Sequence, residues 1–230
     1  MRASRQLIAP IALLLAAIPA GAQVRDGEWV SYRDAYRAMV RFEKFGGPKN
    51  LLVSRLQVQA ADHAPLGEGA HLTLSGKSTQ LNLPLDALGR TMLPLQKSSY
   101  DENAVLVLNR KGLPFSVRPL VSIALRSDGQ YDSADLNAAC GQALGFARYL
   151  DASQGARQCV GVRFVFSKRD QAGARLRRPD GQEQALPATS GPAFGNDAED
   201  GFPVVTWRFG GERAQVNTYN APLAIVPLFD

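Results

Sequence analysis

Two histidines are the only imidazole side chains in this sequence of 230 residues, so any histidine-dependent catalysis or metal binding must use His63 or His71. Asp62 and Glu68 lie near them in the chain, and the four together form a conceivable two-histidine, one-carboxylate metal site. Seven residues separate the histidines, a spacing that fits no ligand pair of a helix or a hairpin. We therefore expect two surface histidines and predict no metal ligand, no cofactor and no catalytic residue.

Three further motifs fall short of the chemistry they suggest. Residues Ser75 to Ser78 read Ser-Gly-Lys-Ser, as at the end of a phosphate-binding loop, but His71 stands where the leading glycine is required. Asn196 to Gly201 resembles a calcium loop, yet Ala198 occupies a ligand position and Trp207 stands where the bidentate glutamate belongs. The Gly-x-Ser-x-Gly motif of serine hydrolases is missing from the sequence. Nucleotide binding at residues 75–78 is excluded, and only weak calcium binding by an acidic loop stays open.

The only two cysteines, Cys140 and Cys159, predict a disulfide bond. Redox pairs usually stand two residues apart, and a nucleophilic cysteine needs a histidine partner, so a structural bridge is favoured over a reactive thiol. Closing a loop of about twenty residues would stabilise the fold by about 3 kcal/mol. The alternative is a pair of buried free thiols.

A basic stretch within residues 168–202 is the one candidate for contact with an anion. The segment shows no packing pattern and predicts a long loop, basic at its start and acidic near its end. Such a loop could contact lipopolysaccharide, peptidoglycan or an acidic protein, or it could simply be solvated. The basic residues are Lys168, Arg169, Arg175, Arg177 and Arg178.

The first 22 residues predict an export signal. Arg2 and Arg5 precede an apolar run from Leu7 to Ile18, and Ala20-Gly21-Ala22 fits a cleavage site near Ala22. The run is shorter than the roughly 20 residues that span a bilayer, and Gln23, not a cysteine, stands immediately after the site, so neither a transmembrane nor a lipid anchor is expected. Removing two arginines and no acid lowers the formal charge from +5 to +3. This weak charge argues against nucleic acid as a partner and leaves a periplasmic or secreted protein.

Hydrophobic periodicity predicts the elements that must position these residues. A period of 3.6 predicts helices over Ser31 to Phe45 and Asp132 to Leu150, and Ser31 with Asp34 resembles a capping box. Alternation with a period of two predicts strands, and Gly210-Gly211 predicts a hairpin between two of them. These strands are Leu51 to Ala60, His71 to Leu74, Gln80 to Leu85, Thr91 to Leu95, Ala104 to Asn109, Phe115 to Leu125, Cys159 to Ser167, Val204 to Phe209, Arg213 to Tyr219 and Leu223 to Leu228.

The fold class expected from these elements is α+β. The strands are mainly antiparallel, in a sandwich or a bent sheet, with two packed amphipathic helices. After the signal, residues 23–130 hold the first helix and a β region, and residues 131–230 hold the second helix, more strands and the loop at 168–202. With 45% apolar residues the chain can bury a proper core, as one domain or two.

One segment resembles a known group of proteins. Residues Leu83 to Leu125 contain Leu-Pro-Leu-Asp, the strand Val-Leu-Val-Leu-Asn at Val105 to Asn109, and the turn Lys111-Gly112. In these features the segment resembles exported Gram-negative proteins known only as domains of unknown function. The resemblance rests on strand and turn patterns, so it implies export and carries over no functional residue.

The sequence thus predicts a non-catalytic exported protein with a role in binding or envelope assembly. Its expected partners are an envelope protein or a cell-wall glycan. One alternative is an exported hydrolase that uses scattered carboxylates, which requires a cleft where two or more Asp, Glu or His side chains converge. Another is a secreted inhibitor or chaperone-like factor, which requires an exposed apolar patch or an unpaired sheet edge.

Overall fold

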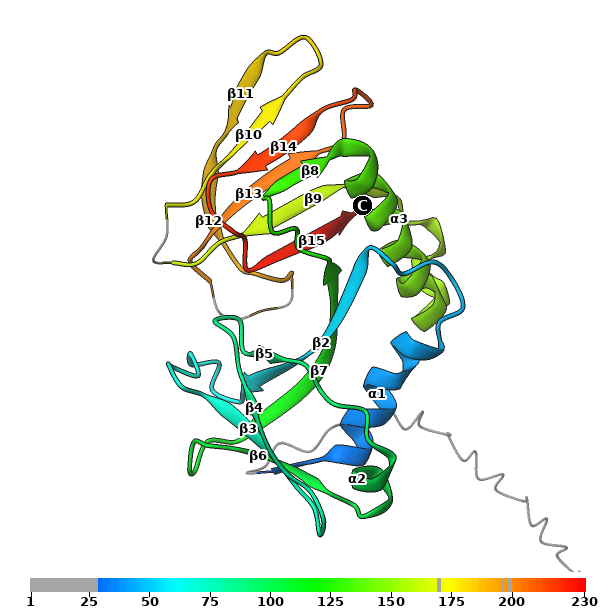
Figure 1. Cartoon of the computed structure of the whole chain (residues 1–230), viewed down its shortest axis with the longest axis vertical. Coiled ribbons are helices and arrows are strands. Elements are labelled where there is room, and N and C mark those ends of the chain that lie inside the picture. Colours follow the sequence, from blue (N-terminus) through cyan, green and yellow to red (C-terminus); the bar gives the residue numbers. More distant parts are fainter. Residues whose placement is uncertain (1–28, 169–170, 196, 198–199) are drawn as a thin grey trace, which may run out of the picture.

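The computed structural model describes residues 29–168, 171–195, 197 and 200–230. The predicted export signal, Arg169, and Asn196, Ala198 and Glu199 of the acidic loop lie outside the described residues. The described chain forms two lobes, which we define as the N-terminal lobe (residues 29–123) and the C-terminal lobe (residues 130–230) (Figure 1). A continuous antiparallel sheet runs through both.

The N-terminal lobe packs α1 between two groups of strands. One group is a four-stranded sheet of order β1-β6-β3-β4, and the other is the end of the shared sheet. Their inner faces share one hydrophobic cluster, which includes Leu56, Leu74, Leu106 and Phe115. The elements of this lobe are β1 (Trp29–Ser31), α1 (Tyr32–Lys44), β2 (Leu52–Ala60), β3 (His71–Ser75), β4 (Gln80–Pro84), β5 (Arg90–Thr91), α2 (Lys97–Asp101), β6 (Val105–Leu108) and β7 (Phe115–Ile123).

Helix α1 confirms the first predicted helix. The Ser31 side chain accepts a hydrogen bond from the Asp34 backbone N–H at 3.4 Å, as an N-cap should. The buried face is apolar, and the helix ends at Lys44, where Phe45 turns extended ahead of Gly46-Gly47-Pro48. The period of 3.6 therefore gave both the element and its inward face.

The C-terminal lobe is a sandwich of two antiparallel sheets beside α3. The four-stranded sheet has the order β11-β10-β14-β8, and the shared seven-stranded sheet has the order β12-β13-β9-β15-β7-β2-β5. Strand β15 thus lies between β9 of this lobe and β7 of the other. The elements are β8 (Gln130–Asp132), α3 (Ser133–Leu150), the 3₁₀ helix η1 (Ala152–Ala156), β9 (Cys159–Val165), β10 (Ala174–Arg177), β11 (Glu183–Leu186), β12 (Ala188–Gly191), β13 (Phe202–Arg208), β14 (Gln215–Thr218) and β15 (Ala224–Phe229).

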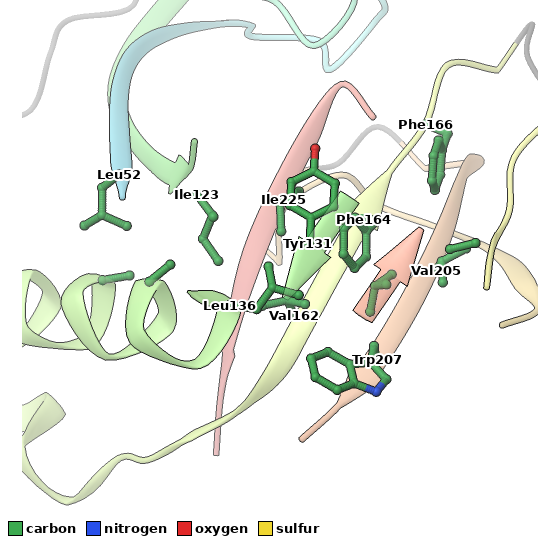
Figure 2. Packing of buried hydrophobic residues seen from close by; sticks show 14 of the residues in the cluster. Leu52, Ile123, Tyr131, Leu136, Val162, Phe164, Phe166, Val205, Trp207 and Ile225 are labelled. Atoms are coloured by element: carbon green, nitrogen blue, oxygen red, sulfur yellow. The ribbon is translucent and has the colours of Figure 1, made fainter. Parts of the chain in front are cut away.

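Side chains from both sheets and from α3 fill the core of this lobe. Figure 2 shows Val162, Phe164 and Trp207 of the shared sheet gathered with Leu136 of α3 and Tyr131 of β8. The Tyr131 and Phe164 rings meet edge to face, with centroids 5.5 Å apart. Because this cluster also takes in side chains from β2 and β7, the shared strands belong to both cores.

The disulfide between Cys140 and Cys159 is present, as predicted. Cys140 is fully buried on α3, Cys159 opens β9, and their Cα atoms lie 5.9 Å apart. The bond ties the helix to the central strand against which it packs.

The predicted fold class is confirmed, since the described elements are mainly antiparallel strands with two long helices. Two expectations are wrong. Residues 168–202 are not one long loop, because β10, β11 and β12 lie within them; Ala174 and Leu176 face inward while Arg175 and Arg177 face out. The strands around Gly210-Gly211 are not a hairpin, because β13 pairs within the shared sheet and β14 within the other.

None of the helices in the described ranges is long and apolar enough to cross a membrane.

Candidate functional site

A cleft of about 450 Å³ lies where the two lobes meet. One wall comes from the N-terminal lobe: the end of β2, the following loop at residues 61–70, and the turn at residues 85–89. The opposite wall comes from the C-terminal lobe and consists of Ser167, Lys168, Asp197 and Phe202. Residues 78 to 145 positions apart in sequence (167 − 89 = 78 and 202 − 57 = 145) therefore line the same cleft.

The loop at residues 61–70 has a fixed shape. Arg110 donates hydrogen bonds from Nε to the Leu66 carbonyl at 3.1 Å and from Nη2 to the Glu68 carbonyl at 2.8 Å. At the start of the loop, the Asp62 carboxylate accepts from the Ala64 N–H at 3.0 Å, and His63 takes a left-handed backbone with φ of 59°. The loop thus holds His63 and Glu68 at the cleft although residues 61–70 form neither a helix nor a strand.

Only one of the two predicted histidines reaches the cleft. His63 and Glu68 line it, whereas His71 begins β3 and places its ring Nδ1 3.3 Å from the Gly69 carbonyl. Within the described part of the chain, no three His, Cys, Asp or Glu side chains gather closely enough to hold a metal ion.

A buried polar network forms part of the cleft wall. The Arg118 guanidinium forms an ion pair with Asp197 and also donates from Nε to the Gln57 side chain at 2.8 Å. Gln57 and Gln59 each place their amide nitrogen 3.4 Å from the Asp197 carboxylate, and Gln57 also bonds to the Leu88 carbonyl at 3.2 Å. The Asp197 side chain is only 7% exposed, and these bonds join it to β2 and β7.

A second carboxylate fixes the turn before β5. Asp86 accepts from the backbone N–H groups of Leu88 and Arg90, both at 2.9 Å, and pairs with the guanidinium groups of Arg90 and Arg55. Arg90 is almost fully buried, and its Nη2 also donates to the Leu223 carbonyl at 2.6 Å, across the boundary between lobes. Asp86 and Arg90 therefore hold the turn in shape and attach it to the C-terminal lobe.

Gly89 is required in this turn. Its φ of 69° lies in the left-handed region, and a Cβ there would stand 2.9 Å from the Val58 carbonyl oxygen. The close approach packs the turn directly onto β2.

The cleft therefore combines neutralised charges with apolar lining. Asp86 and Asp197, its two aspartates, are both held by arginines. Leu66, Leu88 and Phe202 supply apolar surface, and the Lys168 ammonium lies 4.4 Å from the centre of the Phe202 ring. Such a lining can bind a ligand with polar and apolar parts, and it leaves neither aspartate uncommitted for proton transfer.

The basic residues expected to act together are divided by the fold. Lys168 lies at the cleft, while Arg175, Arg177 and Arg178 lie on or just after β10 in the outer sheet of the C-terminal lobe. Arg175 bonds to Tyr219 at 2.9 Å and to Glu183 at 3.2 Å. The stretch thus supplies two separate surfaces instead of one contact loop.

The serine and lysine motif at residues 75–78 forms the turn between β3 and β4. Ser78 donates hydrogen bonds to the Glu102 carboxylate from its hydroxyl and from its backbone N–H, and these bonds lower the pKa of Glu102. The motif therefore has a structural partner within the chain.

Sequence reasoning missed the polar residues that shape the cleft: Gln57, Gln59, Asp86, Arg90, Arg118 and Asp197. One signal was available, since Gln57 and Gln59 alternate with apolar residues along a predicted strand, but their burial depends on Asp197, 140 and 138 residues away.

Comparison of the chain with protein-family models, with curated proteins and with solved structures found no match. The resemblance of residues 83–125 to exported domains of unknown function stays a prediction.

Proposed function

We propose that this protein is an exported, non-catalytic binding protein and that the cleft between its lobes holds a small amphipathic ligand. The observation that carries the proposal is the cleft itself. Its volume of about 450 Å³ falls within the range of roughly 300–1,000 Å³ typical of small-molecule sites.

The pairing of charges favours binding over catalysis. A catalytic carboxylate has to exchange a proton with the substrate, whereas Asp86 and Asp197 are each occupied by hydrogen bonds and by an ion pair with arginine. The apolar side chains offer a surface to the nonpolar part of a ligand, and the amides of Gln57 and Gln59 and the charged groups of the lining offer polar contacts.

Export is supported by two features of different kinds. Residues 1–22 are predicted to direct the chain to export, and the Cys140–Cys159 disulfide is typical of proteins in an oxidising compartment. N-terminal sequencing of the protein recovered from the periplasm should therefore begin just after Ala22. Recovery of a chain that still starts at Met1 would contradict export.

An amphipathic dye tests the cleft directly. Anilinonaphthalene sulfonate should bind the wild-type protein and gain fluorescence. Ala87 is exposed on the cleft wall, so Ala87→Trp should fill the cleft and abolish this gain without touching the core. Ala138→Trp, at an exposed position on α3, is the matched control and should bind as the wild type does. Equal fluorescence in all three proteins would rule out the cleft as the binding site.

A hydrolase is the second candidate, because His63, Glu68, Asp86 and Asp197 all line the same cleft. A panel of ester, peptide and glycoside substrates tests it, with the His63→Gln and Glu68→Gln variants as controls. Turnover by the wild type that either variant abolishes would replace the binding proposal with a catalytic one.

A further inference from the structure

A second, shallow hollow of about 310 Å³ lies on the C-terminal lobe and shares no residue with the cleft. Three of its lining residues are arginines. They come from the end of β10 and from the connection between β13 and β14, so residues 36 positions apart meet there. The lining, which we call the arginine hollow, consists of Asp132, Arg177, Arg178, Pro179, Arg213, Ala214 and Gln215.

Two of the three guanidinium groups are uncommitted. Arg178 is bound to the Glu212 carboxylate at 3.2 Å and to the Gln184 side chain at 3.0 Å. Arg177 and Arg213 are exposed, and neither forms an ion pair or a side-chain hydrogen bond with any residue in the described ranges.

The acidic groups nearby have partners other than Arg177 and Arg213 among the described residues. Glu183, which lies opposite Arg177 on β11, pairs with Arg175 at 3.2 Å. Glu212 is held by Arg178, as described. Asp132 accepts from the Gln215 amide at 3.2 Å and stands at the N-cap of α3, where the positive end of the helix dipole stabilises a carboxylate. The charges of Arg177 and Arg213 are therefore left to attract an anion.

Backbone hydrogen bonds hold the arginine hollow in shape. Ser133 donates its N–H to the Ala214 carbonyl at 2.8 Å, and the Ala214 N–H donates to the Ser133 hydroxyl at 3.1 Å. Arg177 pairs with Gln215 in the β10–β14 ladder, and Arg178 closes a turn by donating to the Gln182 carbonyl at 2.9 Å. A frame fixed in this way lowers the ordering cost of binding.

We propose that the arginine hollow binds a phosphate group through Arg177 and Arg213. A guanidinium presents its N–H donors as a planar fork that matches two oxygens of a phosphate, and two such groups without a partner among the described residues can share the anionic oxygens of one phosphate. The phosphate can be free or carried by a lipid headgroup. This site is independent of the cleft and of its proposed ligand.

Isothermal titration of the full chain with inorganic phosphate at low ionic strength tests the proposal. The double variant Arg177→Gln/Arg213→Gln should weaken binding by about tenfold or more, because the phosphate loses both of its charged partners. Arg41→Gln/Lys44→Gln removes the same charge from exposed positions on α1 and should leave binding unchanged. No heat of binding to the wild type, or equal weakening in both double variants, would overturn the proposal.

Sedimentation with phosphatidylglycerol vesicles separates the two sources of phosphate. If the wild type binds both inorganic phosphate and the vesicles, and Arg177→Gln/Arg213→Gln binds neither, the hollow recognises the phosphate group itself in either ligand. Titration with phosphate alone identifies a free or soluble ligand, whereas binding to vesicles alone identifies a lipid headgroup. Vesicle binding that survives the double variant, without any phosphate binding, would contradict the assignment.

Discussion

The cleft and the arginine hollow both gather arginines, but they use them differently. At the cleft, Arg90 and Arg118 bond to carboxylates and lie partly or wholly inside the protein. At the hollow, Arg177 and Arg213 face solvent without a partner among the described residues. Arg90 and Arg118 are therefore structural in the first region, whereas in the second Arg177 and Arg213 are available for a ligand and only Arg178 is paired.

This contrast shows that the number of charges near a surface does not locate a binding site. Paired charges at the cleft fix the positions of the walls, so the proposed ligand would meet a preformed shape. Unpaired charges at the hollow attract an ion from solution, so binding there should weaken as salt screens them. Four predictions test this difference.

Removing the disulfide should have the largest effect on stability. Cys140→Ala/Cys159→Ala should lower the free energy of unfolding by about 3 kcal/mol, because the unfolded chain regains the freedom of a closed loop of about twenty residues. Denaturant unfolding of the oxidised wild type and the variant measures this change. Phosphate binding should also weaken, since α3 carries Ser133, which braces the hollow, whereas dye binding at the cleft should persist. If the variant lost dye binding at the cleft but kept phosphate binding at the hollow, the prediction would be wrong.

Breaking the ion pair at the cleft should come next. Arg118→Met leaves the Asp197 carboxylate buried with only amide partners, and the free energy of unfolding should fall by about 2 kcal/mol. The loss is smaller than for a fully buried pair because the Arg118 side chain is 27% exposed. Arg177→Met is the matched control and should change stability by less than about 0.5 kcal/mol. Similar losses in the two variants would remove the distinction between the regions.

Alkaline pH should loosen the strand that supports the hollow. Burial raises the pKa of the Tyr131 phenol above its ordinary value of 10.0. The folded state then holds the proton more tightly than the unfolded state, so stability is intact below pH 10 and falls as pH rises through and above that value. Tyr131→Phe should cost about 1 kcal/mol at neutral pH, because its hydroxyl accepts from the Arg126 N–H.

Chemical denaturation at several alkaline pH values, with Tyr131→Phe beside the wild type, provides the measurement. The variant should lose less stability than the wild type as pH increases. An identical pH dependence would mean that Tyr131 is not the group responsible.

The smallest expected change in stability belongs to the hollow itself. Arg213→Gln should alter the free energy of unfolding by less than about 0.5 kcal/mol, since the exposed side chain has no partner among the described residues. The same variant should still reduce phosphate binding, and added salt should narrow its difference from the wild type. Destabilisation by more than 1 kcal/mol would show that Arg213 is structural, like the arginines of the cleft.

Local patterns in the sequence predicted the elements better than the sites. Helix α1, helix α3 and the disulfide follow from periodicity, capping residues and the cysteine count, all of which are read within short segments. The ion pair of Arg118 with Asp197 joins residues 79 positions apart, and although Asp197 lies in the acidic segment that resembles a calcium loop, nothing in the sequence indicated Arg118 as its partner. The sequence indicated only part of the arginine hollow. Arg177 and Arg178 lie in the basic stretch, whereas Arg213 lies in the connection from β13 of the shared sheet to β14 of the other sheet.

The position of β15 also sets when the protein can finish folding. This strand fills the place between β9 and β7, so the shared sheet stays in two pieces until residues 224–229 have left the ribosome. A chain released before that point would expose two open strand edges, which invite pairing with other chains. A chain truncated at residue 223 should therefore aggregate.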